Sequence, residues 1–355
     1  MVIQNTTSGI PSSGSEEVVQ LLPEVLGKGA YGKVHVGIYC GQRVAVKLVD
    51  TAFQPDLSSS WQSGTAGTAP NLKAAGGTSA TEALTAQTFA QELEVMGRCQ
   101  HPNIVRIMAA CMKPPRPFLV MELMGTALDK LMYSKGPTLL PMDLVLHIAI
   151  EVARGLAYLH PTIIHRDLKP GNVLINDPWG ERPVVKISDF GLSRLNSTIA
   201  FTQSPEAGTP AYVAPECFDV DNNSISYKAD MYSFGVLLWE MLAGTRPWEG
   251  LGPVPIAFQI AFKGSRLPTP PLNKLGSSPT RWPPRLCEML QECWDQAPDR
   301  RPAAAELAKR LVLMQQVRCV CSGSDYVLAA AHALVLHNAA VVTMYILCFS
   351  RLVLE

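Results

Sequence analysis

The fold of this chain is decided by one run of eight residues, HRDLKPGN at positions 165–172. The run holds a carboxylate, an amine and an amide, which can accept a proton, carry positive charge and ligate a cation. Four further motifs accompany it in a fixed order, namely GKGAYGKV at 27–34, VAVK at 44–47, DFG at 189–191 and APE at 214–216. Five motifs in one register, from residue 27 to residue 216, make a chance match untenable.

The first of these motifs is a glycine-rich loop containing Gly27, Gly29 and Gly32. Glycines let main-chain amides approach phosphate oxygens closely. Dinucleotide-binding folds share this spacing, but there the loop leads from a strand into a helix. Here the loop leads into a second apolar strand pattern over residues 33–38, and VAVK follows on a third. This order favours a loop that covers the phosphates of a nucleoside triphosphate.

The ordered motifs resemble those of the eukaryotic protein kinases. KPGN at 169–172 and GTPAYVAPE at 208–216 are similar to the serine/threonine type, and DFGLSR at 189–194 with SFGVLLWE at 233–240 resembles the tyrosine-kinase-like group. The resemblance covers about residues 21–315. It implies an α+β, bilobal fold, in which a small antiparallel β lobe with one regulatory helix adjoins a larger, mainly α-helical lobe.

The resemblance also implies a catalytic set of four residues. Asp167 would accept the proton of a substrate hydroxyl, and Lys169 would offset the charge that develops on the transferred phosphate. Lys47 would hold the α- and β-phosphates of the nucleotide. A lysine between two layers of structure needs a carboxylate partner. The segment FAQE at 89–92, within the helical pattern of residues 88–99, resembles the helix motif of the family that supplies this carboxylate, which nominates Glu92 as the partner.

ATP and Mg²⁺ are the cofactors that the resemblance implies. Asn172 and Asp189 would supply oxygen ligands to Mg²⁺. Val34 and Ala45 would lie above the adenine ring and Leu174 below it, with Met121 as the gatekeeper at the back. The implied nucleotide-binding residues are Gly27, Gly29, Gly32, Val34, Ala45, Lys47, Met121, Glu122, Met124 and Leu174.

Two structural features of the family are also expected. The first is a stack of buried side chains held in place through Asp230; its members are Met96, Ile107, His165 and Phe190. The second is an ion pair between Glu216 and Arg301 inside the large lobe, whose rupture would leave an uncompensated buried charge.

The resemblance indicates a serine/threonine specificity and a route to regulation. An arginine before the catalytic aspartate, here Arg166, often pairs with a phosphate on the activation segment. An upstream activating kinase would supply that phosphate, and Thr202 or Ser204 is the favoured acceptor. The candidate acceptors between Gly191 and Gly208 are Ser193, Ser197, Thr198, Thr202 and Ser204.

Composition shifts divide the chain into three parts, the second of which contains an insertion. Residues 1–17 are rich in Ser, Thr and Gly and read as a disordered leader, and residues 18–317 form the kinase domain. Residues 51–86 carry few charges and read as a flexible insertion in the small lobe. Residues 318–355 form an apolar C-terminal tail of unknown role.

The charge balance and the cysteines limit which partners and which cellular compartment are expected. Thirty basic and thirty acidic residues cancel, so no broad electrostatic attraction to nucleic acid is expected. Protein substrates are what the kinase resemblance implies. Nine scattered cysteines without a Cys-x-x-Cys pair indicate neither a disulfide framework nor a zinc site. Together with an N-terminus unlike a secretory signal, they favour a cytoplasmic location.

The segment 326–350 has no charged residue and is mostly apolar. As a helix it would be long enough to span a bilayer, but His332, His337 and Asn338 lie within it. Three readings stay open: a membrane tether, a helix packed on the large lobe, or a poorly ordered extension. The tether is not the favoured one.

Two other function classes compete with a protein kinase. A pseudokinase or nucleotide-binding scaffold is disfavoured because Lys47, Asp167, Asn172 and Asp189 are all present. A small-molecule kinase is disfavoured because the segment 208–216, which resembles a peptide-positioning loop, is complete.

Overall fold

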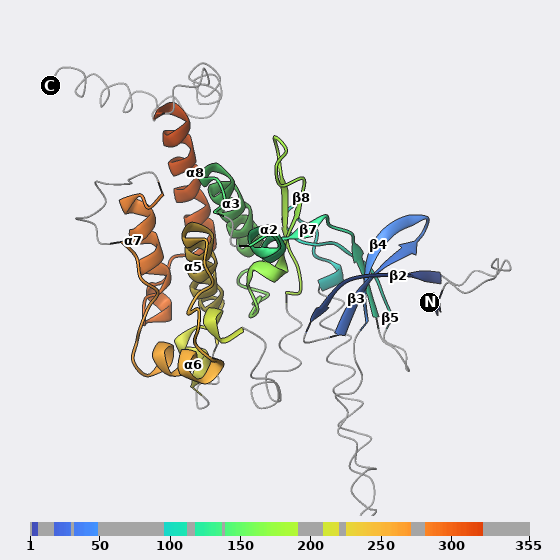
Figure 1. Cartoon of the computed structure of the whole chain (residues 1–355), viewed down its shortest axis with the longest axis horizontal. Coiled ribbons are helices and arrows are strands. Elements are labelled where there is room, and N and C mark those ends of the chain that lie inside the picture. The colour runs from blue at the N-terminus through green and yellow to red at the C-terminus, as the bar shows by residue number, and fades with distance from the viewer. Residues whose placement is uncertain are drawn as a thin grey trace, which may run out of the picture.

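The computed structural model describes residues 2–5, 18–29, 32–48, 96–111, 118–136, 139–190, 209–219, 225–270 and 281–321. A β-sheet lies at one end of the molecule and a body of helices at the other (Figure 1). The expected bilobal α+β fold is therefore confirmed. Of the helix expected over residues 88–99, only Met96 onward lies within the described residues.

The small lobe is one sheet with the strand order β1-β2-β3-β4-β6-β5 among the described residues. All neighbouring strands from β2 onward pair antiparallel. The strands are β1 (Val2–Asn5), β2 (Val18–Gly29), β3 (Gly32–Tyr39), β4 (Gln42–Leu48), β5 (Ile107–Cys111) and β6 (Phe118–Glu122).

The two-residue period of β4 gives the sheet two different faces. Val44 and Val46 are buried on the outer face, in a cluster with Val120 and Phe118 of β6. The intervening residues of a strand point to the opposite face. The alternation in the VAVK motif therefore directs Ala45 and Lys47 together toward the large lobe.

The strand β1 corrects one expectation from the sequence. It lies within the segment 1–17, which was predicted to be disordered, and it pairs parallel with β2 through the register Val2↔Val18 to Asn5↔Leu21. The prediction is wrong for these four residues, because β2 offers an open edge whose main-chain groups favour an added strand. The rest of that segment lies outside the described residues.

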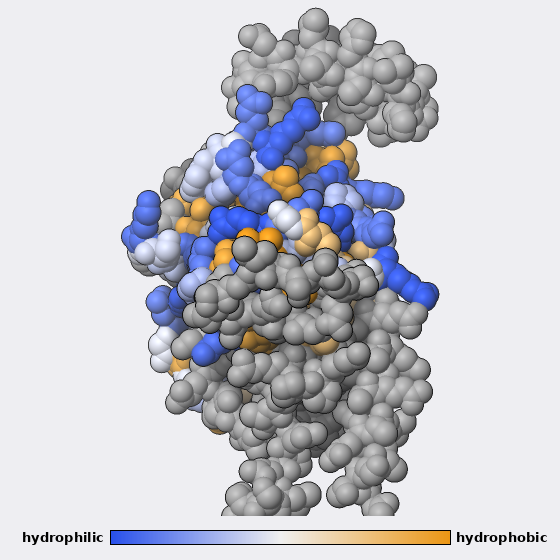
Figure 2. Space-filling model, turned by 90° about the vertical axis from the view of Figure 1, so that its right-hand side faces the viewer, coloured by the Kyte–Doolittle hydropathy of each residue, from blue (hydrophilic) through white to orange (hydrophobic). Residues whose placement is uncertain are grey.

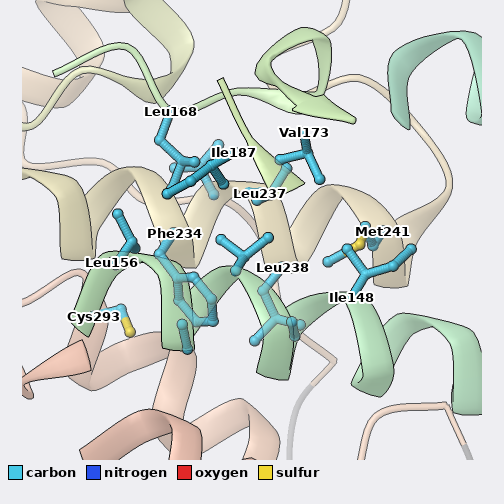
Figure 3. Packing of buried hydrophobic residues seen from close by; sticks show 14 of the residues in the cluster. Ile148, Leu156, Leu168, Val173, Ile187, Phe234, Leu237, Leu238, Met241 and Cys293 are labelled. Carbon is cyan, nitrogen blue, oxygen red and sulfur yellow. The ribbon is translucent and has the colours of Figure 1, made fainter. Parts of the chain in front are cut away.

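The large lobe is built around the helix α5 (Lys228–Ala243), which is buried from Ala229 to Leu242. Figure 3 shows side chains of α5 packed together with side chains from α3, β8, β9 and α7. The helix ends at Gly244, whose left-handed conformation (φ 68°) lets its amide donate to the Glu240 carbonyl oxygen. The other helices are α2 (Leu128–Tyr133), α3 (Met142–Leu159), α6 (Pro253–Ala261), α7 (Pro284–Cys293) and α8 (Ala304–Cys321).

A second, small sheet lies in the large lobe and was not anticipated from the sequence. Its order is β7-β8-β9, and all of its pairs are antiparallel. Its strands are β7 (Thr126–Ala127), β8 (Val173–Asn176) and β9 (Val184–Ile187). Short 3₁₀ turns complete the lobe: η2 (Pro170–Asn172), η4 (Thr209–Tyr212), η5 (Pro215–Phe218) and η7 (Pro298–Arg300). On the face seen in Figure 2, hydrophilic residues cover most of the coloured surface.

The C-terminal boundary of the domain also differs from expectation. Helix α8 continues without a break to Cys321, so the boundary predicted at residue 317 falls inside a helix. In the part of the chain that the structure describes, no helix has both the length and the apolar character that a membrane crossing needs. The apolar segment 326–350 lies outside those residues, as does the insertion 51–86.

Candidate active site

The HRDLKPGN run forms a tight loop that continues into η2 and then β8. The Lys169 ammonium contacts both oxygens of the Asp167 carboxylate, at 3.0 and 2.8 Å. The Asn172 side-chain amide donates to the Asp167 carbonyl oxygen at 2.7 Å and to its carboxylate at 3.0 Å. The carboxylate, amine and amide expected from the sequence therefore meet around Asp167, which is only 8% exposed.

Helix α5 holds this loop from beneath through Asp230, which is fully buried. Its carboxylate accepts hydrogen bonds from the main-chain amides of His165 and Arg166, both at 2.8 Å, and contacts His160 Nε2 at 2.8 Å. Arg166 adopts φ 66°, a left-handed conformation that residues with a side chain rarely adopt. The hydrogen bonds to Asp230 stabilise it here. The expected role of Asp230 as the anchor of this region is in line with these contacts.

The four residues expected to stack above Asp230 are all buried or partly buried. Met96 and Phe190 are buried in the main core, and Ile107 packs against it. His165 is fully buried, and burial lowers the pKa of its imidazole. A neutral ring fits the hydrogen bond that His165 Nδ1 accepts from the Asp167 amide at 3.3 Å.

Lys47 joins the two lobes. Its ammonium lies 2.8 Å from Asp189 Oδ1, and the lysine side chain is 2% exposed while that of Asp189 is 22% exposed. The carboxylate partner predicted for this lysine was Glu92, which lies outside the described residues. Asp189 adopts φ 60°, and the adjacent Ser188 amide donates to the Asn172 carbonyl at 2.9 Å. These contacts bring the DFG motif against the catalytic loop.

The donor set fits a hard cation such as Mg²⁺. Asn172 uses its side-chain nitrogen to contact Asp167, so its side-chain oxygen is directed away from these contacts. Asp189 follows Ser188, whose amide bonds the Asn172 carbonyl oxygen, and would supply a second oxygen ligand. Magnesium prefers oxygen ligands and retains several waters. Two protein ligands of this kind suffice when phosphates and water complete the shell.

An apolar group that we call the interlobe cluster lies between the sheet and β8. Ala45, Val105, Met121 and Met124 are buried in it, apart from the two larger cores. The partly buried residues packed against it include Leu26, Val34, Ile107, Leu123 and Leu174. It brings together five residues predicted around the adenine ring, namely Val34, Ala45, Met121, Met124 and Leu174.

Glu122, another predicted nucleotide-binding residue, uses its side chain otherwise. Its carboxylate accepts hydrogen bonds from Lys186 Nζ at 2.6 Å and from the Arg106 amide at 2.7 Å. The carboxylate thus connects the end of β6 to β9 of the large lobe. The side chain of Glu122 is therefore committed to contacts within the protein.

The glycine-rich loop connects β2 to β3. Gly27 pairs with Val34 and Gly29 pairs with Gly32, so the hairpin closes at residues 30 and 31, which lie outside the described residues. Gly32 has φ 124°, a conformation that only glycine adopts readily. The tip of the loop therefore depends on glycine at this position.

One buried network near the site was not predicted from the sequence. The Glu240 carboxylate of α5, 1% exposed, accepts hydrogen bonds from Tyr133 Oη at 2.7 Å and Tyr212 Oη at 2.6 Å. Burial raises the pKa of Glu240 to about 7 despite these bonds. Tyr212 belongs to η4, so the network fixes the segment that was predicted to position the peptide.

The predicted ion pair of the large lobe is present. Both terminal nitrogens of Arg301 donate to Glu216, each at 2.7 Å, and the arginine side chain is fully buried. The guanidinium also lies over the Tyr232 ring, with 5.4 Å from its central carbon to the ring centroid. The pair fixes η5 to the base of the lobe.

Comparison with known proteins gives several relatives that cover most of this chain. It is 33% identical over 290 residues (81% of the chain) to serine/threonine-protein kinase STY46 of Arabidopsis thaliana. It is 34% identical over 301 residues (83%) to the Arabidopsis serine/threonine/tyrosine-protein kinase HT1. It is 33% identical over 305 residues (83%) to human mitogen-activated protein kinase kinase kinase 10. The chain spans 42%, 66% and 28% of the lengths of these relatives, which is less than two thirds of each.

A family model agrees with the relatives and with the geometry of the site. The model described as protein tyrosine and serine/threonine kinase matches residues 21–311. The match takes in both lobes and all five motifs from which the sequence argument began. The chain therefore belongs to the protein tyrosine and serine/threonine kinase family.

Proposed function

We propose that this chain is a serine/threonine protein kinase that transfers the γ-phosphate of ATP to hydroxyl groups of protein substrates. The observation that carries the proposal is the convergence of Asp167, Lys169 and Asn172 in one hydrogen-bonded group, next to the Lys47–Asp189 ion pair. The names of the three relatives support the same reaction class.

Each residue has a role that follows from its chemistry. Asp167 accepts the proton of the attacking hydroxyl and orients that hydroxyl toward the γ-phosphorus. Lys169, already 2.8 Å from Asp167, offsets the negative charge on the transferred phosphate. Asn172 and Asp189 would hold a magnesium ion, which neutralises phosphate charge when bound.

The nucleotide is held by two kinds of contact. The interlobe cluster offers an apolar surface to the adenine ring, and Lys47 offers its ammonium to the α- and β-phosphates. The pair between Lys47 and Asp189 keeps the buried ammonium from being left uncompensated. If Glu92 pairs with Lys47 in the active enzyme, Asp189 becomes available to the metal.

Substrate class, regulation and location are part of the proposal. The residues KPGN at 169–172 and the segment 208–216 favour serine and threonine over tyrosine. An upstream kinase would phosphorylate Thr202 or Ser204, both outside the described residues, and Arg166 would receive that phosphate. We place the enzyme in the cytoplasm, on the cysteine pattern of the sequence.

Transfer of labelled phosphate from ATP tests the proposal directly. The wild-type chain with Mg²⁺ should label a degenerate library of Ser- and Thr-containing peptides. Asp167→Ala should reduce labelling by at least about a hundredfold, because general-base positioning contributes on that scale. The matched control Asp143→Ala changes an aspartate whose side chain is 77% exposed and should keep full activity.

The competing reading is a pseudokinase or nucleotide-binding scaffold. It predicts that the wild-type chain binds ATP without labelling any peptide, and that Asp167→Ala leaves ATP binding unchanged. Labelling of peptides by Asp167→Ala at the wild-type rate would contradict the role given to this residue.

A further inference from the structure

Strand β2 is irregular directly before the glycine-rich loop. Val25 pairs with His35 and Gly27 pairs with Val34, so β2 advances by two residues where β3 advances by one. Leu26 is the extra residue of this β-bulge, and such a residue is left out of the hydrogen-bond ladder between the strands. The carbonyl group of Leu26 is therefore available to a donor from another element.

The donor to this carbonyl group comes from the large lobe. The Lys130 ammonium of α2 lies 2.7 Å from the Leu26 carbonyl oxygen and donates a hydrogen bond to it, across 104 positions of the chain. Lys130 is exposed, whereas the side chain of Leu26 packs against the interlobe cluster. The bond therefore joins the two lobes at the solvent-facing edge of the surface proposed for the adenine ring.

Helix α2 is firmly held in the large lobe, on the side of the helical body that faces the sheet (Figure 1). Leu128 and Met132 are fully buried in the main core. The helix also packs against η2, the continuation of the catalytic loop. A Cβ atom added at Gly171 of η2 would lie only 3.7 Å from Asp129 Oδ2. Lys130 thus extends from an element that is fixed to the catalytic loop.

The segment of β2 that accepts the bond is exposed on both sides of Leu26. Val25 is 47% exposed, and a Cβ atom added at Gly27 would meet no atom of the described residues within 4 Å. The bulge also interrupts the pairing with β3 at this point. This end of β2 can therefore lift together with the glycine-rich loop, and the bond from Lys130 opposes that movement.

We propose that Lys130 is a positioning residue of the nucleotide site, which fastens the start of the glycine-rich loop to α2 and slows the departure of the nucleotide. The inference rests on the proposed kinase function and adds to it a residue that controls product release. A nucleotide between Val34 and Leu174 can leave only after these two surfaces separate. Their separation breaks the bond between Lys130 and Leu26, so this bond contributes to the barrier for release.

The test measures the departure of ADP from the full chain. Protein loaded with ADP and Mg²⁺ is mixed in a stopped-flow apparatus with an excess of a fluorescent ATP analogue, whose binding reports the release of ADP. Lys130→Met removes the donor and keeps most of the length of the side chain, whereas Lys130→Arg keeps a charged donor. The matched control is Lys135→Met, at an exposed lysine two residues beyond the end of α2.

The expected result is a change in release without a change in chemistry. Lys130→Met should release ADP about fivefold faster than the wild type, the factor that one hydrogen bond typically contributes. Lys130→Arg and Lys135→Met should release ADP at the wild-type rate. The burst of peptide phosphorylation at saturating ATP should keep its rate in Lys130→Met, because the ammonium bonds the small lobe and not the catalytic loop.

Other outcomes would overturn the inference. Equal release of ADP from Lys130→Met and the wild type would show that the bond does not restrain the nucleotide. A slower burst in Lys130→Met with unchanged release would make Lys130 a support of the catalytic loop. Release from Lys130→Arg as fast as from Lys130→Met would separate the effect from the bond to Leu26. If the wild type binds neither ADP nor the ATP analogue, the proposed kinase function itself fails.

Discussion

At the scale of single residues, the large lobe depends on charges that are buried with their partners. Arg301 is completely enclosed, makes two bonds to Glu216, and also contacts Lys228 and Asp295 through main-chain oxygens. A buried guanidinium is tolerated only while such partners are in place. Residues of this kind are needed for folding and take no part in the reaction.

Replacing Glu216 by Ala should therefore destabilise the protein strongly. The Arg301 charge would keep its burial and lose two bonds, which costs about 3–5 kcal/mol in the free energy of unfolding. Urea denaturation followed by circular dichroism measures the change. The double variant Glu216→Gln/Arg301→Leu should recover part of the loss, and a double variant as unstable as Glu216→Ala would contradict this account.

A second residue-scale prediction concerns Glu240. Its pKa is raised by burial from 4.5 to about 7, so the folded protein holds a proton that the unfolded chain has already released between these pH values. The free energy of unfolding should therefore fall as pH rises from about 4.5 to about 7, by up to roughly 3 kcal/mol from this group. Denaturant titrations at several pH values measure the slope.

Glu240→Gln should flatten that part of the pH profile, because the glutamine cannot ionise. The control Glu306→Gln, at a carboxylate whose side chain is 57% exposed on α8, should leave the profile as in the wild type. Equal slopes in Glu240→Gln and the wild type would refute the assignment of the titration to this carboxyl.

At the scale of secondary-structure elements, prediction from the sequence succeeded where a pattern is local. The alternation Val44-Ala45-Val46-Lys47 predicts a strand and places Ala45 and Lys47 on the face toward the large lobe, as the structure shows. The catalytic loop was recognised because its groups lie within eight residues. The strands β7, β8 and β9 were missed because runs of two to four residues are too short to show a period.

Contacts between elements far apart in the chain could not be predicted from a single sequence. Tyr133 and Tyr212 lie 107 and 28 positions from Glu240, and the glutamate sits inside an apolar run. Nothing local signals that the three side chains meet. For α6, the sequence shows a run without charged residues, but only the fold shows that Ile256 and Ile260 face inward while Val254 and Phe262 stay in solvent.

At the scale of the whole molecule, the two lobes meet through a few contacts of different kinds. Lys47 pairs with Asp189, Glu122 binds Lys186, and Leu174 packs under Ala45 and Met121 in the interlobe cluster. The two ion pairs connect strands of the small lobe to the DFG motif and to β9. A nucleotide bound at the interlobe cluster would contact both lobes at once and should hold them together.

Thermal unfolding with added ligand tests this arrangement. ATP with Mg²⁺ should raise the Tm of the wild type, since a ligand present at about a hundred times its Kd stabilises by roughly 2.7 kcal/mol. Lys47→Met should lose most of the shift with ATP and retain the shift with adenosine, which has no phosphates to bind the amine. Lys309→Met, at an exposed residue of α8, should behave as the wild type with both ligands. Equal ATP shifts in Lys47→Met and the wild type would rule out the proposed phosphate contact.

The hydrogen bonds that Asp230 accepts from the amides of His165 and Arg166 have a consequence for repeated turnover. Because this carboxylate stands on a helix enclosed by the core, the loop above it keeps its shape whether or not anything is bound. The entropy of ordering these residues is then lost once, when the chain folds, and is not lost again in each round of catalysis. The catalytic loop is therefore already ordered when the substrates bind.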